Sequence, residues 1–138
     1  GYSHKGIHKI GWNHITVMKD DKIYVMDKHT LELQIPDPVE SWCDLNAYAF
    51  EAVSDGKVQL FSCNGKRIFE TTKGHFLWEN ANQEGWNGRH AVRIFNKDSG
   101  QEVFMVNELT PSDNPNELLL FRTYYDRNNN VIIPRAQA

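Results

Sequence analysis

The feature that most constrains this chain is a period-two alternation of apolar and polar residues, in short runs along almost its whole length. Successive side chains of a β-strand point to opposite faces, so this pattern is typical of strands with one buried face. The runs are also rich in the β-branched and aromatic residues that strands favour. They are HITVMK, KIYVMD, AYAFEAV, KVQLFSC, KRIFET, HAVRIFN, QEVFMVN and ELLLFRTYY. The alternation predicts an all-β protein.

Short polar turns separate the runs, and four of them predict hairpins: KDD at 19–21, NG at 64–65, KDSG at 97–100 and RNNN at 127–130. Asn-Gly is typical of a type I′ turn, in which both central residues have positive φ. The turns do not recur at a fixed period, which argues against a propeller or a solenoid. We therefore expect an antiparallel β-sandwich or flattened barrel of about eight to ten strands, built from successive hairpins.

Within this sheet structure, Val92 and Ile94 share one face of a strand. We expect that face to be buried together with the corresponding face of the next strand, which is Val103 and Met105 or Phe104 and Val106, depending on the register.

Helical signals are weak. PDPVESWCDLN, from Pro36 to Asn46, offers Asp37 as an N-cap before a first-turn Pro38. This predicts at most one short helical turn, near residues 37–45.

Two long polar segments interrupt the pattern of strands. ENANQEGWNGR at 79–89 is rich in Asn and Gly, and residues 107–117 contain Pro111 and Pro115 among Asn, Asp and Ser. Both segments are predicted to be irregular loops. Long loops in small proteins often carry the function, so these two are the first places to look for a site.

The length and charge of the chain limit the number of domains and the kinds of partner that it can have. At 138 residues, it fits a single all-β domain over 1–138, with residues 1–8 as a flexible N-terminal arm. The net charge is −3, and the basic residues are scattered, which argues against nucleic acid as a partner. No apolar run approaches the roughly 20 residues that a membrane-spanning helix needs, so we expect no membrane insertion.

The two cysteines, Cys43 and Cys63, predict a compartment. Two cysteines in a small domain are typical of one disulfide in an exported protein and of two buried thiols in a protein that is not exported. The first residue is Gly rather than Met, which allows a removed export signal. We therefore expect a Cys43–Cys63 disulfide and a periplasmic or secreted protein whose signal peptide has been removed.

Three histidines, His4, His8 and His14, lie in the opening stretch GYSHKGIHKIGWNH. Glycines make a helix that would place His4 and His8 on one face unfavourable, and the intervening lysines repel a divalent cation. This stretch is interpreted as a solvated arm. We expect no metal and no cofactor.

The sequence contains none of the common catalytic motifs. The chain has no GxSxG, SxxK or HExxH motif and no phosphate-binding glycine loop. A small enzyme could use His75 and His90 with Glu79 and Glu84 as a His/carboxylate site, or the two glutamates as an acid–base pair, but their spacing matches no known motif. The favoured interpretation is that the protein is not an enzyme.

Aromatic residues in the segment 79–89 favour binding. Trp86 lies between glycines, where no strand pattern would bury it, and Trp78 precedes the segment. An exposed Trp is typical of a protein interface or of a platform that stacks on a sugar. Trp86 is predicted to be the largest single contributor to partner binding, unless it folds back over a sheet end. A carbohydrate-binding module that uses Trp78 and Trp86 is the first alternative function.

Acidic residues favour a basic partner. Asp37, Glu40 and Asp44 surround the weak helical signal, and a rigid acidic loop is suited to plugging a cleft lined by basic groups. The predicted function is therefore a non-catalytic exported protein that blocks a partner, most simply an immunity or inhibitor protein against a cell-wall-degrading enzyme, a basic hydrolase or a toxin effector. A homodimer is left open. The predicted contact residues are Trp78, Glu79, Glu84, Trp86, Asn87, Arg89, Glu108, Asp113 and Glu117.

Overall fold

The structure is a computed structural model that describes residues 9–81 and 90–138. Within it the chain divides into two compact units, Gly1–Phe76 and Leu77–Ala138, and each is described by itself. The expectation that 1–138 form one domain stays a prediction. The flexible arm predicted at 1–8 lies outside the described residues.

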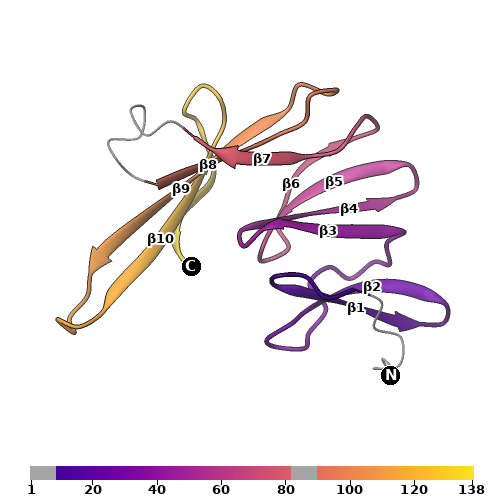
Figure 1. Cartoon of the computed structure of the whole chain (residues 1–138), viewed down its shortest axis with the longest axis horizontal. Coiled ribbons are helices and arrows are strands. Elements are labelled where there is room, and N and C mark those ends of the chain that lie inside the picture. Colours follow the sequence, from indigo (N-terminus) through magenta and orange to yellow (C-terminus); the bar gives the residue numbers. More distant parts are fainter. Residues whose placement is uncertain (1–8, 82–89) are drawn as a thin grey trace. The chain divides into compact units, whose positions relative to one another are not determined.

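The described residues contain strands and turns but no helix, and all paired strands are antiparallel (Figure 1). Sheet order is β1-β2 and β3-β4-β5-β6 in the first unit, and β11-β10-β9-β8-β7 in the second. The strands are β1 (His14–Lys19), β2 (Lys22–Asp27), β3 (Ser41–Asn46), β4 (Ala49–Ser54), β5 (Lys57–Ser62), β6 (Arg67–Thr71), β7 (Leu77–Asn80), β8 (His90–Phe95), β9 (Glu102–Pro111), β10 (Leu118–Tyr125) and β11 (Val131–Gln137).

This order confirms the predicted all-β fold built from successive hairpins. None of the three sheets closes into a barrel over the residues described. That part of the chain also contains no helix of the length and apolarity needed to span a bilayer.

The four predicted hairpin turns are present, and further turns join β3 to β4 and β4 to β5. Asp20 and Asp21 have φ values of 53° and 62°, and Asp55 and Gly56 have 51° and 72°, so these two connections have the positive φ pair of a type I′ turn. The prediction of a type I′ turn at 64–65 is wrong, because only Gly65 has a positive φ there and a type I′ turn needs two such residues. Ser62 N–H bonds to Lys66 O, which closes a three-residue loop whose last residue is left-handed.

In the first unit, the β1–β2 hairpin packs against the β3–β6 sheet. Trp42 on β3 donates from Nε1 to Thr16 Oγ1 on β1 at 2.6 Å, which joins the two sheets. The shared core consists of Val25, Ile35, Val39, Trp42, Phe50, Ala52 and Phe61.

Residues 37–40 form an extended link between these two sheets. Val39 N–H bonds to Ile23 O on β2, and Glu40 N–H bonds to Val53 O on β4. The helical turn considered near 37–45 does not form, because these N–H groups bond to strands and β3 begins at Ser41. Trp42 is buried while its neighbours on β3 are exposed, as the period of a strand requires.

A buried hydrogen-bonded pair also connects the two sheets. His14 on β1 is fully buried, and its Nδ1 lies 2.7 Å from Asp44 Oδ1 on β3. The other oxygen of Asp44 accepts from the backbone N–H groups of Asn13 and His14 at 3.1 and 3.3 Å. Nε2 of His14 lies 3.1 Å from Gln34 Oε1. His14, predicted to belong to a solvated stretch, is therefore part of the core.

In the second unit, the register of β8 and β9 confirms the predicted buried face. Val92 lies opposite Met105 and Ile94 opposite Val103, and none of the four is more than 2% exposed. Alternate residues of these strands point to the other face, where Ala91 and Val106 form a smaller cluster.

The predicted Cys43–Cys63 disulfide is wrong, because neither cysteine forms a disulfide in the structure. Cys43 pairs across to Glu51 on β4, whereas Cys63 follows β5 on the other side of β4. Two strand spacings alone separate them by at least about 10 Å, and a disulfide requires Cα atoms within about 7 Å.

Titration of the denatured, unreduced protein with a thiol reagent should therefore find two free thiols. In the native protein, exposed Cys43 should react before half-buried Cys63. A gain of two hydrogen atoms in intact mass on reduction would show that the bridge forms after all.

Candidate functional site

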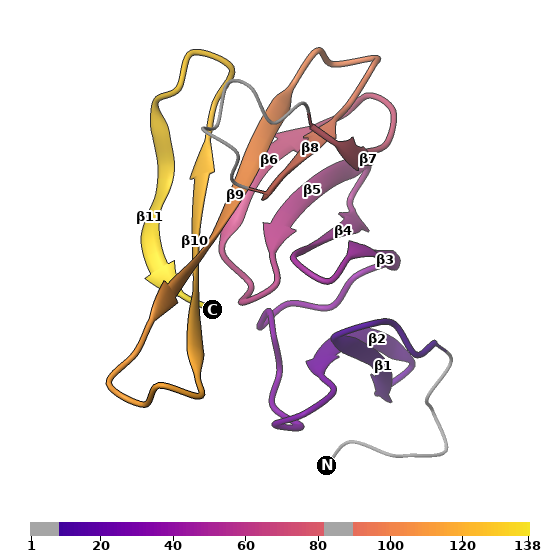
Figure 2. The same ribbon diagram turned by 60° about the vertical axis from the view of Figure 1, so that its left-hand side comes forward.

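Strands β9 and β10 continue past the rest of their sheet as a two-stranded hairpin. Over the described residues, β8 pairs with β9 only as far as Asn107, and β11 pairs with β10 only from Phe121 onward. Residues 108–120, which we call the arm, extend beyond the described part of β8 and beyond β11, and Leu120 O at the base of the arm still accepts from Ala138 N–H at 2.9 Å (Figures 1 and 2).

The arm corrects the loop predicted at 107–117. β9 continues through Pro111, and only 112–117 form a loop. Pro111 is tolerated because the strand ends there, and a proline at a strand end removes no essential ladder hydrogen bond. The sequence signal that was missed is the apolar residues on both sides of the polar segment PSDNPN.

The base of the arm is fixed on both faces of the sheet. On one face, Arg122 Nε donates to Asn107 Oδ1 at 2.9 Å, and both residues are buried. On the other face, Arg135 lies over the Phe121 ring at 3.8 Å and donates to Glu108 Oε2 at 2.9 Å. The predicted contact residue Glu108 is thus already engaged within the unit.

One face of the arm is apolar. Cross-strand pairing places Leu109 opposite Leu120 and Pro111 opposite Leu118, so all four side chains share a face. Leu109 is 66% exposed and Leu118 is 60% exposed. Along β9, this face continues the buried side of the sheet that carries Met105. The arm therefore presents core-like residues to solvent.

The tip of the arm is acidic and ordered. Asp113 and Glu117 are exposed. Ser112 Oγ donates to Asn114 O and to Glu117 O at 3.0 Å, and Glu117 N–H bonds to Asn114 O at 3.0 Å. These bonds hold the tip in one conformation, so it loses less entropy on binding.

The other predicted contact residues are only partly described. Trp78 on β7 is 41% exposed, opposite Ile94 on β8. Glu79 lies 3.0 Å from Arg93, which also bonds to Glu102 at 2.7 Å. Burial lowers the pKa of Arg93, but the hydrogen bonds to Glu102 and Glu79 outweigh it and raise that pKa. Glu84, Trp86, Asn87 and Arg89 lie outside the described residues.

The alternative catalytic set stays a prediction, because Glu84 lies outside the described residues. His75 Nδ1 lies 2.8 Å from Glu51 Oε2, and Glu51 Oε1 accepts from Phe76 N–H at 2.7 Å. His90 Nδ1 lies 3.2 Å from Asn107 Nδ2. Each histidine thus has a partner that sequence reasoning did not predict.

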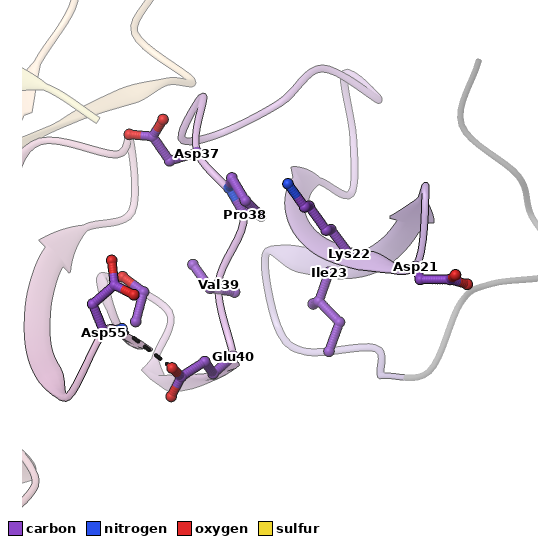
Figure 3. A pocket seen from close by; sticks show the side chains of 9 residues that line it. Asp21, Lys22, Ile23, Asp37, Pro38, Val39, Glu40 and Asp55 are labelled. Carbon is purple, nitrogen blue, oxygen red and sulfur yellow. Dashed lines mark hydrogen bonds between the residues drawn. The ribbon is translucent and has the colours of Figure 1, made fainter.

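The first unit carries a separate groove. Its first part has a volume of about 720 Å³, and its second part, about 390 Å³, shares Asp37, Pro38, Val39 and Ser54 with it. Figure 3 shows Lys22 and Ile23 on one side of the 37–40 link, and Asp55 on the other. The groove is formed by segments that are far apart in sequence, so no local pattern could have predicted it.

Within the described part of the chain, His, Cys, Asp and Glu side chains do not gather in a group of three or more that could hold a metal ion. Comparison with known proteins found no matching family model, no matching curated protein and no matching solved structure. The arm and the groove must therefore be interpreted from their own chemistry.

Proposed function

We propose that this chain is a non-catalytic binding protein that blocks another protein, and that the arm is its principal contact. The observation that carries the proposal is the exposed apolar face of the arm, with Leu109 and Leu118 both at least 60% exposed beside an acidic tip. Soluble proteins rarely leave contiguous apolar surface uncovered unless it binds something.

The size of the arm favours insertion over face-to-face docking. A stable interface uses about 20–30 residues on each side, whereas one face of the arm offers only the four side chains Leu109, Pro111, Leu118 and Leu120. A cleft that encloses both faces of the arm would cover more of it. Blocking the cleft of an enzyme or effector fits this shape better than self-association through one face.

The charge of the tip indicates the kind of cleft. Asp113 and Glu117 would meet a basic rim, which would steer association and speed it at low salt. A cell-wall-degrading hydrolase or a toxin effector with a basic cleft is the partner class we propose. This role places the protein in the periplasm or outside the cell.

Replacing Leu109 and Leu118 by serine should weaken binding to such a partner at least about 30-fold, the effect of losing one interface hot spot. The measurement is inhibition of a panel of basic cell-wall hydrolases, followed by clearing of a wall suspension. Val131→Ser on β11 is the matched control, because Val131 is 54% exposed in the same unit.

Equal inhibition by the double variant and the wild type would remove the arm from the interface. Absence of inhibition across the whole panel would remove the partner class. Turnover of a wall substrate by the chain alone would contradict a non-catalytic role.

The carbohydrate-module alternative has one supporting observation, the exposure of Trp78 on β7. If the chain is a module of that kind, Trp78→Ala should abolish sugar binding, whereas Leu109→Ser and Leu118→Ser should leave sugar binding unchanged. The same pair of variants therefore separates the two functions.

A further inference from the structure

The groove of the first unit is held open by rigid walls. Pro36 and Pro38 fix the backbone on either side of Asp37, and proline has a restricted φ. Val39 and Glu40 are hydrogen-bonded to β2 and β4, so the 37–40 link cannot move without breaking bonds to both sheets. A preformed site of this kind loses little entropy when it is filled.

The floor of the groove is apolar along its length. Ile23 and Val39 line the first part, and Ile35, Val39 and Phe61 line the second. The volume of each part, about 720 and 390 Å³, falls within the range of roughly 300–1,000 Å³ that is usual for a ligand pocket. An extended aliphatic or peptide chain fits this floor better than a compact polar molecule.

The charges of the groove differ between its ends. Asp21, Glu40 and Asp55 line the first part alone, and Asp37 lines both parts. Lys22 is the one basic residue that lines the first part among those described. Glu40 Oε1 accepts from Asp55 N–H at 3.2 Å, which holds these two residues together. The far end is lined by Arg67, whose Nη1 lies 3.4 Å from Glu70.

From this charge pattern we infer that the groove binds an extended segment of another protein, with a lysine or arginine side chain at the acidic end and apolar residues along the floor. The difference in charge selects this occupant over a free polyamine. A polyamine is cationic along its whole length and would place an ammonium group beside Arg67. A peptide with one basic residue followed by apolar residues places its single positive charge at the acidic end and no charge beside Arg67.

An array of random heptapeptides tests this inference. The wild-type chain should select peptides that carry a lysine or arginine next to two or three apolar residues. The best peptide, made in solution with blocked ends, should bind about tenfold more weakly when its basic residue is replaced by glutamine. It should bind similarly weakly to Asp37→Asn/Asp55→Asn, since two exposed ion pairs together give an effect of this size.

Asp20→Asn is the matched control. Asp20 neighbours the groove residue Asp21 in the β1–β2 turn but does not line the groove, and asparagine tolerates its φ of 53°. This variant should bind the peptide as the wild type does. Leu109→Ser/Leu118→Ser should also bind it normally, so failure of the groove and failure of the arm are distinguishable.

Three results would overturn the inference. The first is an array with no preference for basic residues. The second is a preference that survives in Asp37→Asn/Asp55→Asn. The third is displacement of the selected peptide by spermidine at a lower concentration than by the unlabelled peptide, which would assign the groove to small polycations.

Discussion

Phe50→Ala is expected to lower the free energy of unfolding of the first unit by about 3–5 kcal/mol, as for other large aromatic residues truncated in a core. Phe50 on β4 is fully buried. Its ring lies 4.4 Å from the His14 ring and 5.0 Å from the Phe61 ring, so it contacts both sheets of the unit. Its removal leaves a cavity at the joint between them. Urea unfolding followed by circular dichroism measures the change.

Ile10→Ala is the control for this measurement, because Ile10 is 66% exposed in the same unit and should change the stability by less than about 0.5 kcal/mol. A loss below about 1 kcal/mol in Phe50→Ala would mean that the two sheets close over the cavity. In that case Phe50 would not be the centre of this core.

The strands were predictable because their signal is local. Alternation along HAVRIFN and QEVFMVN predicted both the strands and the buried face formed by Val92 and Ile94. Hairpin turns were predictable for the same reason. The type of turn was less so, because a type I′ turn depends on the φ of both central residues, and Asn64–Gly65 belongs to a three-residue loop closed by Ser62 and Lys66.

Features that depend on tertiary contacts were not predictable. His14 looked like part of a solvated stretch because its partner, Asp44, is 30 residues away. The disulfide was predicted from the number of cysteines, but the positions of Cys43 and Cys63 on opposite sides of β4 cannot be read from their spacing.

In the candidate sites, too, local features were predictable and features that depend on tertiary contacts were not. Asp113 and Glu117 were predicted as contact residues, and they lie at the tip of the arm. The leucines beside them were missed, because prolines at 111 and 115 made the whole segment resemble a loop. The groove joins residues 21–23, 37–40 and 54–55, so it exists only once the two sheets have packed.

Asp44→Ala is expected to destabilise the first unit by about 3–5 kcal/mol, because it removes the acceptor of three hydrogen bonds and each buried donor left unpaired costs about 1–3 kcal/mol. The carboxylate of Asp44 is only 3% exposed and accepts three hydrogen bonds, one from the ring of His14 and two from the backbone N–H groups of Asn13 and His14. Alanine leaves all three donors without an acceptor, and each buried unpaired donor is unfavourable.

The surroundings of Asp44 allow little repair. A Cβ added at Gly11 would lie 2.1 Å from Asp44 Oδ2, so the backbone approaches the carboxylate more closely than any other residue would allow. Gly11→Ala should therefore also destabilise the unit, through displacement of the same carboxylate. Glu32→Ala, which removes an exposed carboxylate from a residue without a positive φ, serves as the control for Asp44→Ala.

His14→Phe separates the ring contact from the rest of the site. It removes one of the three hydrogen bonds to Asp44 and the contact of Nε2 with Gln34, but it keeps an aromatic ring against Phe50, and Asp44 retains its two backbone donors. Its loss of stability should be smaller than that of Asp44→Ala in the same urea titration. If His14→Phe is the more damaging change, the histidine ring rather than the carboxylate organises the joint between the two sheets. If neither changes stability by more than about 1 kcal/mol, the joint depends on its apolar contacts alone.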